Sequence, residues 1–75
     1  MAPERSGLEE EQQAARVRSA LAELPGNQRE VVELHWFEER PFAEVAQIVG
    51  ASEGAVRVRA HRAYKRLKEL LEEDR

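Results

Sequence analysis

The feature that most limits the fold of this 75-residue chain is an apolar stripe near its carboxyl end. The stripe recurs at steps of four, three, four and three residues and consists of Val56, Ala60, Ala63, Leu67 and Leu70. This spacing puts all of these side chains on one face of an α-helix, which is predicted to cover about residues 53–71. Other elements must cover such a face, and the lack of two-residue alternation elsewhere indicates that they are helices too.

A first covering helix is predicted over about residues 8–23. Ser6 followed by Glu9 has the spacing of a capping box, in which both side chains bond free backbone N–H groups at a helix start. The apolar positions of this helix are Ala14, Val17, Leu21 and Leu24. Pro25-Gly26 ends the pattern, because neither residue favours a helix interior.

A second helix is predicted over about residues 28–38. Asn27 is a candidate N-cap, with Glu30 three positions later for the reciprocal bond. The apolar residues of this helix occupy several of its sides and are Val31, Val32, Leu34, Trp36 and Phe37. The second helix should therefore pack on more than one face.

A third, short helix is predicted after Pro41, which suits a first helical turn because its missing N–H is not needed there. Its buried residues should be Phe42, Val45, Ala46 and Val49. Gly50 fits the left-handed position that ends a helix, and Ser52 can cap the next one. A short helix, a tight turn and a basic helix over residues 42–62 have the arrangement of a helix-turn-helix. A helical hairpin that uses the same small residues for packing alone is the alternative.

Together these patterns predict an all-α fold, a four-helix domain with a helix-turn-helix at its carboxyl end. Residues 1–7 are expected to be a flexible tail or a linker remnant, and residues 8–75 the folded domain. A chain of this length buries roughly 60% of the surface that it exposes when unfolded, so its core should be small.

Composition excludes several function classes. The chain has no cysteine, which rules out a disulfide framework, a zinc finger and a thiol nucleophile. His35 is expected to be partly buried and hydrogen-bonded, and it lies too far from His61 in sequence to suggest a metal site. No apolar run approaches the roughly 18 residues of a membrane span, and the start of the chain lacks the pattern of a signal peptide. We therefore expect a cytoplasmic protein that is not an enzyme and has no metal, cofactor or membrane partner.

The formal net charge is −3, but the charges are unevenly distributed. Residues 1–53 hold eleven acids and five bases, whereas residues 54–68 hold six bases and no acid, and residues 69–75 carry −3. A positive block on one helix can dominate the local field of an acidic protein, because nearby charges set that field. The block indicates either a nucleic-acid-binding face or an ordinary solvated helix face.

Four blocks of sequence carry a family resemblance: Leu24-Pro25, Gln28-Arg29-Glu30-Val31, Ala43-Glu44-Val45-Ala46 and Gly54-Ala55-Val56-Arg57-Val58-Arg59-Ala60-His61-Arg62-Ala63. They resemble region 4 of bacterial sigma factors, most of all the extracytoplasmic-function group, over about residues 11–71. The chain departs from the family pattern at Ala55, Val58 and Tyr64, where the family usually has Thr, Ser, and Arg or Lys. Because it lacks the region 2 of that family, the chain is similar to an excised C-terminal domain or to a free-standing region-4-like protein.

The resemblance implies particular DNA-contacting residues. Those that would read bases in the major groove are Arg57, Val58, His61 and Arg62. Residues at the start of the same helix, which could meet phosphates or nearby bases, are Ser52, Glu53 and Ala55. Those expected to attract phosphates are Arg59, Lys65 and Arg66. Arg40 could touch the DNA backbone or be an ordinary exposed arginine.

The resemblance also implies the function and the partners. Region 4 binds the minus-thirty-five promoter element and the flap of the RNA polymerase β subunit, and anti-sigma factors commonly occlude both surfaces. Trp36 and Phe37 are most simply core residues, but their exposure would favour a groove for a flap helix. Two alternatives remain: a response-regulator-type DNA-binding domain, and a protein-interaction module that binds the flap or an anti-sigma factor.

Overall fold

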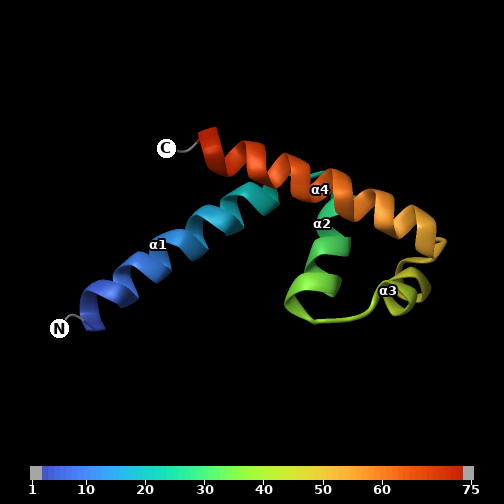
Figure 1. Cartoon of the computed structure of the whole chain (residues 1–75), viewed down its shortest axis with the longest axis horizontal. Helices are drawn as coiled ribbons and strands as arrows, with labels where there is room; N and C mark the ends of the chain where they lie inside the picture. Colours follow the sequence, from blue (N-terminus) through green and yellow to red (C-terminus); the bar gives the residue numbers. More distant parts are fainter. Residues whose placement is uncertain (1–2, 74–75) are drawn as a thin grey trace.

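This computed structural model describes residues 3–73, and its regular elements are all helices (Figure 1). The helices are α1 (Pro3–Ala22), α2 (Gly26–Val32), α3 (Phe42–Val49) and α4 (Glu53–Glu73), with a π-helical turn, η1 (Glu33–Phe37), continuing α2. Side chains are described for residues 10–72. The all-α, four-helix prediction is confirmed.

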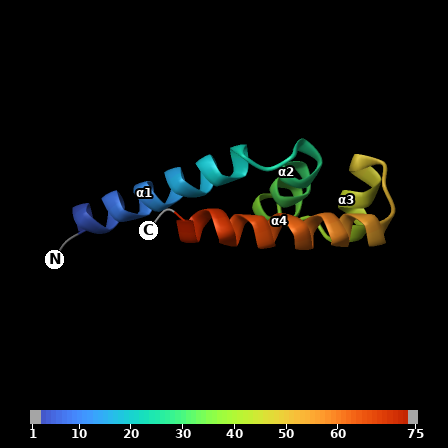
Figure 2. The same cartoon turned by 90° about the horizontal axis from the view of Figure 1, so that it is seen from above.

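The longest helix, α4, is the spine on which the other helices pack. Figures 1 and 2 show α2 and α3 lying against its first half and the end of α1 against its second half, with the rest of α1 diverging from the body. The Cα trace measures 47 × 24 × 14 Å, so the molecule is elongated along α4. The start of α1 and the end of α4 lie toward the same end of this long axis (Figure 1).

Two small clusters of buried side chains make up the core. The first joins α2, α3 and the start of α4 through Val31, Val45, Ala46, Val56 and Ala60. The second joins α1, α2 and the middle of α4 through Leu21, Leu24, Val32 and Ala63. Tyr64 packs against both clusters. The predicted stripe on α4 is confirmed, with Leu67 only half-buried. Small alanines in the stripe let the other helices approach α4 closely.

The predicted start of the first helix is wrong by five residues. The backbone is helical from Pro3, where a proline is tolerated because a first-turn N–H has no intrahelical partner. Ser6 therefore lies inside α1 and cannot be its N-cap; its side chain and that of Glu9 lie outside the described ones. Ala14 is exposed, because α1 reaches the core only from about Val17 onward. The division of the chain at residue 8 into a tail and a domain stays a prediction.

The predicted second helix is corrected at both ends. Asn27 lies inside α2, and the N-cap is Pro25, whose carbonyl oxygen accepts hydrogen bonds from the next turn. After Val32 the helix widens into η1, where the N–H of Glu38 bonds the carbonyl oxygen of Glu33, five residues earlier, at 3.1 Å. A π turn shifts every later residue around the helix relative to a regular α-helical register.

Trp36 and Phe37 lie at the surface, 63% and 60% exposed, so their prediction as core residues is wrong. The prediction that the second helix packs on more than one face is nevertheless confirmed, since Val31 and Val32 enter different core clusters.

The turn between α3 and α4 forms as predicted. Gly50 has φ of 74°, the left-handed conformation that a glycine adopts without a Cβ clash. The Oγ of Ser52 accepts a hydrogen bond of 3.1 Å from the N–H of Ala55, as expected of an N-cap. Pro41 precedes α3 as its N-cap, one position before the predicted one. This tight turn fixes how α3 braces the first turns of α4.

Candidate nucleic-acid interface

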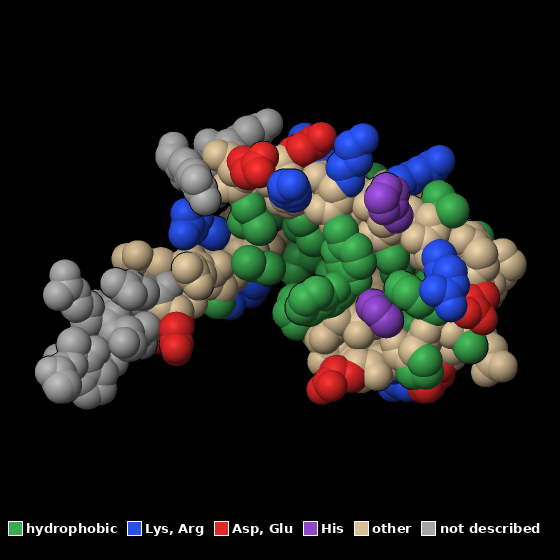
Figure 3. Space-filling view, viewed as in Figure 1, with side chains coloured by type: hydrophobic (Ala, Val, Ile, Leu, Met, Phe, Trp, Pro, Cys, Tyr) green, Lys and Arg blue, Asp and Glu red, His purple; other side chains and the backbone are tan. Residues whose placement is uncertain are grey.

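The first turns of α4 present a basic outer face. Arg57, Val58, His61, Arg62 and Lys65 are exposed on the side opposite the buried stripe. Lys and Arg side chains follow the outer edge of this helix in Figure 3. The structure thus brings together, on one accessible helix face, all four residues expected to read bases.

Two of the predicted site residues on α4 are half-buried beside this face. Arg59 is half-buried on the flank of α4, beside the core stripe. Ala55 is also half-buried and lies beside the Ser52 cap. Because the Ser52 oxygen already accepts the Ala55 N–H, only its hydroxyl proton remains to be donated to a phosphate.

Acidic residues at the edges of the basic block pair with two of its cations. Glu53 lies 2.6 Å from Nη2 of Arg57, and Glu69 lies 3.3 Å from Nη1 of Arg66. The remaining cations of the block have no ion pair among the described side chains and are Arg59, Arg62, Lys65 and Lys68. The positive electrostatic potential is therefore strongest in the middle of α4. It is weaker at the ends of the block, where Glu53 and Glu69 pair with Arg57 and Arg66. The i,i+4 spacing of Glu53 and Arg57 could have revealed the first pair from sequence.

Arg57 also lies against an aromatic ring. Its Cζ is 4.9 Å from the ring centroid of Phe42, within the range of a cation–π interaction. The same ring stacks on the His35 imidazole, with centroids 4.0 Å apart and planes inclined by 13°. The sequence had assigned Phe42 only to the core.

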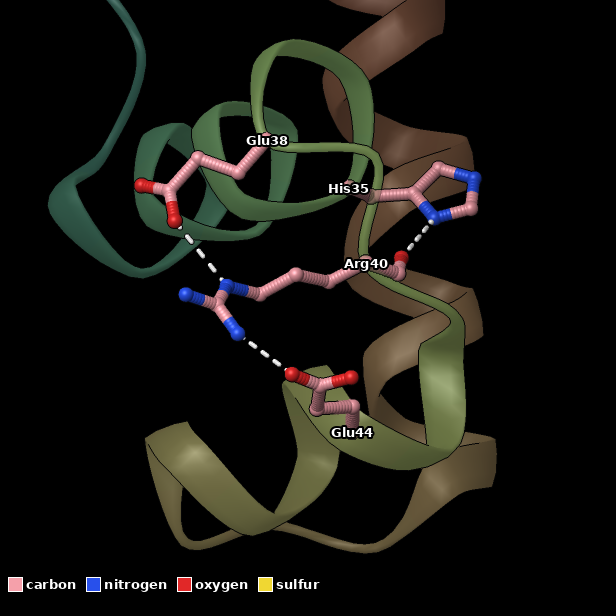
Figure 4. A network of polar contacts seen from close by, with 4 residues as sticks. All are labelled: His35, Glu38, Arg40 and Glu44. Atoms are coloured by element: carbon pink, nitrogen blue, oxygen red, sulfur yellow. Dashed lines mark hydrogen bonds and ion pairs between the residues drawn. The ribbon is translucent and has the colours of Figure 1, made fainter.

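Arg40 is held by two carboxylates rather than being an isolated surface cation (Figure 4). Its Nε lies 2.9 Å from Glu38, and its Nη1 pairs with Glu44 on α3. The hydrogen bond to Glu38, which has the larger effect, and the one to Glu44 both raise the pKa of Arg40 above its ordinary value. Its carbonyl oxygen accepts a hydrogen bond of 2.8 Å from Nδ1 of His35, which confirms that this histidine is partly buried and hydrogen-bonded.

A second accessible surface lies between α1, η1 and α4. It is an apolar groove of about 180 Å³, lined by Val17, Leu21, Val32, Trp36, Phe37, Tyr64 and Leu67. Apolar side chains gather at this place in Figure 3. Trp36 meets Tyr64 edge to face at 6.0 Å, and the buried Tyr64 hydroxyl has no hydrogen-bond partner among the described residues. Burial raises the pKa of Tyr64.

Among the described residues, no three His, Asp or Glu side chains are grouped closely enough to hold a metal ion. No helix in the described part of the chain combines the length and the apolar character that a membrane crossing needs.

Comparisons with known proteins agree with this geometry. The family model described as sigma-70, region 4 matches residues 8–67. RNA polymerase sigma factor CarQ of Myxococcus xanthus is 46% identical over 54 residues, which are 72% of this chain and 31% of CarQ. ECF RNA polymerase sigma factor ShbA of Streptomyces griseus subsp. griseus is 45% identical over 60 residues, 80% of this chain and 31% of ShbA. The chain thus spans about a third of the length of these curated relatives.

A solved structure supports the same assignment at the level of the fold. A chain of the RsbN-BldN complex superposes with a TM-score of 0.75 and 29% sequence identity, over 87% of this chain and 47% of that one. The resemblance stated from the sequence is confirmed, and these matches favour it over a response-regulator-type domain.

Proposed function

Because this chain belongs to the sigma-70 region 4 family, we propose that it binds the minus-thirty-five promoter element and recruits RNA polymerase in transcription initiation. The observation that carries the proposal is the exposed, basic outer face of α4, presented at the start of the helix by the Gly50 turn. A helix presented in this way enters the major groove with its N-terminal turns, where side chains reach base edges.

The residues of this face fall into two groups, those placed to reach base edges and those placed to attract phosphates. Arg57 and Arg62 lie in the first three turns, where an arginine can bond both acceptors of a guanine. Lys65 lies further along and attracts phosphates, as Arg59 does from the flank of the helix, whereas the ion pair with Glu69 weakens the same attraction by Arg66. Glu53 holds Arg57 rather than meeting a phosphate, which a carboxylate would repel. The Arg40 side chain links Glu38, just after η1, to Glu44 on α3, so its contribution to DNA binding is indirect.

Replacing Arg57 or Arg62 with alanine is expected to relax base preference at one promoter position each and to cost about 1–3 kcal/mol of binding free energy. Lys68→Ala should have little effect, or weaken all sequences alike, because Lys68 lies about 16 Å beyond Arg57 along α4. The measurement is a competition of the parent and the three variants against a library of promoter-like duplexes. The docking polarity would be wrong if Lys68→Ala changed the preferred sequence while both arginine variants kept it.

The second surface is proposed as the protein-docking site. The groove beside Trp36 and Phe37 is apolar, whereas the outer face of α4 is basic, so the two surfaces suit chemically different partners. An apolar helix such as the polymerase β flap fits the groove, and an anti-sigma factor can compete for it. Trp36 and Phe37, two large aromatic side chains on one turn, stay mostly exposed, which is typical of a protein-interaction surface.

Trp36→Ala is expected to weaken binding of a β-flap peptide at least tenfold while leaving the melting temperature nearly unchanged, because Trp36 is already exposed. Ile48→Ala is the matched control, since Ile48 is an exposed apolar residue on α3 outside the groove. Titrating each variant with flap peptide and with DNA would show which surface binds which partner. Equal loss of peptide binding in both variants would argue against the groove.

The family is one of non-enzymatic transcription regulators. We propose accordingly that this chain performs no catalysis and acts in the cytoplasm, where RNA polymerase works.

A further inference from the structure

We propose that Phe42 is a positioning residue for Arg57, holding its guanidinium in place to read a base. The inference rests on the proposed function, because it concerns how one residue of the same DNA-binding face is presented. Phe42 belongs to α3 and Arg57 to α4, so their contact joins the two helices of the helix-turn-helix.

Three planar groups lie one on another across this junction. The His35 imidazole stacks on the Phe42 ring at 4.0 Å, and the Arg57 Cζ lies 4.9 Å from the centroid of the same ring. The imidazole is itself fixed, because its Nδ1 donates to the Arg40 carbonyl oxygen at 2.8 Å (Figure 4). The stack therefore links the backbone after η1 to the reading face of α4.

The ring and Glu53 hold the guanidinium from two directions. Glu53 engages Nη2 at 2.6 Å, one turn before Arg57 on the same helix. A guanidinium has five N–H donors, so others remain for the two acceptors of a guanine. The Arg57 residue is still well exposed, with 59% of its side-chain surface accessible. The Arg57 guanidinium is thus held in one orientation and remains accessible to DNA.

Preorganisation of this kind should act on base selectivity more than on general affinity. A free arginine side chain loses rotamer freedom when it forms a bidentate contact, and a ring that already restricts it reduces that loss. Phe42 carries no charge and cannot attract phosphates, so removing its ring should leave the salt dependence of binding unchanged.

The test compares Phe42→Leu, which removes the ring but keeps an apolar side chain, with Phe42→Tyr, which keeps the ring. Phe42→Leu should lower the preference for the favoured base pair at the Arg57 position by about two- to fivefold, as expected for an exposed cation–π contact. Phe42→Tyr should retain the preference. In an Arg57→Ala background, Phe42→Leu should change the preference no further, and the melting temperature of each variant controls for folding.

A measurement without DNA tests the geometry in the parent protein. Nuclear magnetic resonance should show the Arg57 side-chain protons shifted upfield by the ring current of Phe42, with the shift reduced in Phe42→Leu. Absence of that shift in the parent would overturn the inference. So would a Phe42→Leu effect that is equal for all sequences or that persists in the Arg57→Ala background.

The two proposals can fail separately. A parent protein that binds all duplexes alike would overturn the proposed function, and with it the base-reading role of the stack, even with the ring-current shift present. A parent protein that selects promoter sequences but shows no dependence on the Phe42 ring would overturn the positioning role alone.

Discussion

Val56→Asp is expected to abolish folding at neutral pH. The Val56 side chain is completely inaccessible to solvent and lies in the first core cluster with Val31 and Val45, where α2, α3 and α4 meet. An ionised carboxylate there would be buried without a partner. Protonating an aspartate at pH 7 instead costs about 4 kcal/mol, given an ordinary pKa of about 3.9. Since a domain of this length has a total stability of about 4–11 kcal/mol, little would remain.

The pH dependence of this loss has a definite sign. Burial raises the pKa of the introduced carboxyl in the folded state above its unfolded value. The stability difference from the parent should therefore be smallest below about pH 4 and should grow as pH rises toward neutrality. Circular dichroism melting curves of both proteins at several pH values would measure it. Parent-like melting of the variant at pH 7 would show that the core is misplaced.

Val58→Asp is the matched control, because it makes the same change two residues later on the outer face of α4. Val58 is 48% exposed, so the new carboxylate would remain hydrated and the fold should survive. This variant should instead bind DNA more weakly, since it places a negative charge among the residues proposed to read bases. Val56→Asp should therefore cost stability on the buried face of α4, whereas Val58→Asp should cost DNA affinity on its outer face.

Affinity for duplex DNA is expected to fall steeply with salt. Four cations of the basic block have no ion pair among the described side chains. If each neutralises one phosphate, the slope of log affinity against log salt is about −3.6, and affinity falls roughly a hundredfold between about 0.05 and 0.2 M salt. Fluorescence anisotropy titrations across this range would measure the slope. A flat response would exclude an electrostatic role for the block.

The ion pair at the end of the block gives a sharper form of this test. Glu69→Gln releases Arg66 and should steepen the slope by about 0.9, the contribution of one further phosphate contact. Glu30→Gln changes the net charge by the same amount but lies on α2, without an ion pair among the described residues. The Glu30→Gln control should therefore leave the slope of log affinity against log salt nearly unchanged.

The parts of this fold that could be predicted are those in which one local rule decides the outcome. The stripe through Val56 and Ala63 follows from helical periodicity, and no competing pattern disturbs it. Gly50 and Ser52 were predictable because a left-handed turn and an N-cap each depend on a single residue. For the same reasons, the face of α4 that carries the candidate site could be assigned before the structure.

Other parts depend on contacts that a single helix does not encode. The turn η1 contains one residue more than a fixed period of 3.6 allows, and the exposure of Trp36 and Phe37 depends on which sides of this helix its neighbours leave uncovered. The contact of Phe42 with Arg57 joins separate helices, so spacing along the chain could not reveal it. The early start of α1 was missed because Ser6 offered a plausible cap that the backbone does not use.

The division of the core into two clusters bears on the order in which the chain folds. The first cluster closes over residues 31–60, whereas the second needs the end of α1 to meet Ala63. Closing the longer loop costs more chain entropy, and only the last turns of α1 gain contacts in return. We therefore expect the helix-turn-helix to assemble first on a partly formed α4, with α1 docking in a later and more easily reversed step. A nascent domain would thus acquire its helix-turn-helix half before its amino-terminal helix has settled.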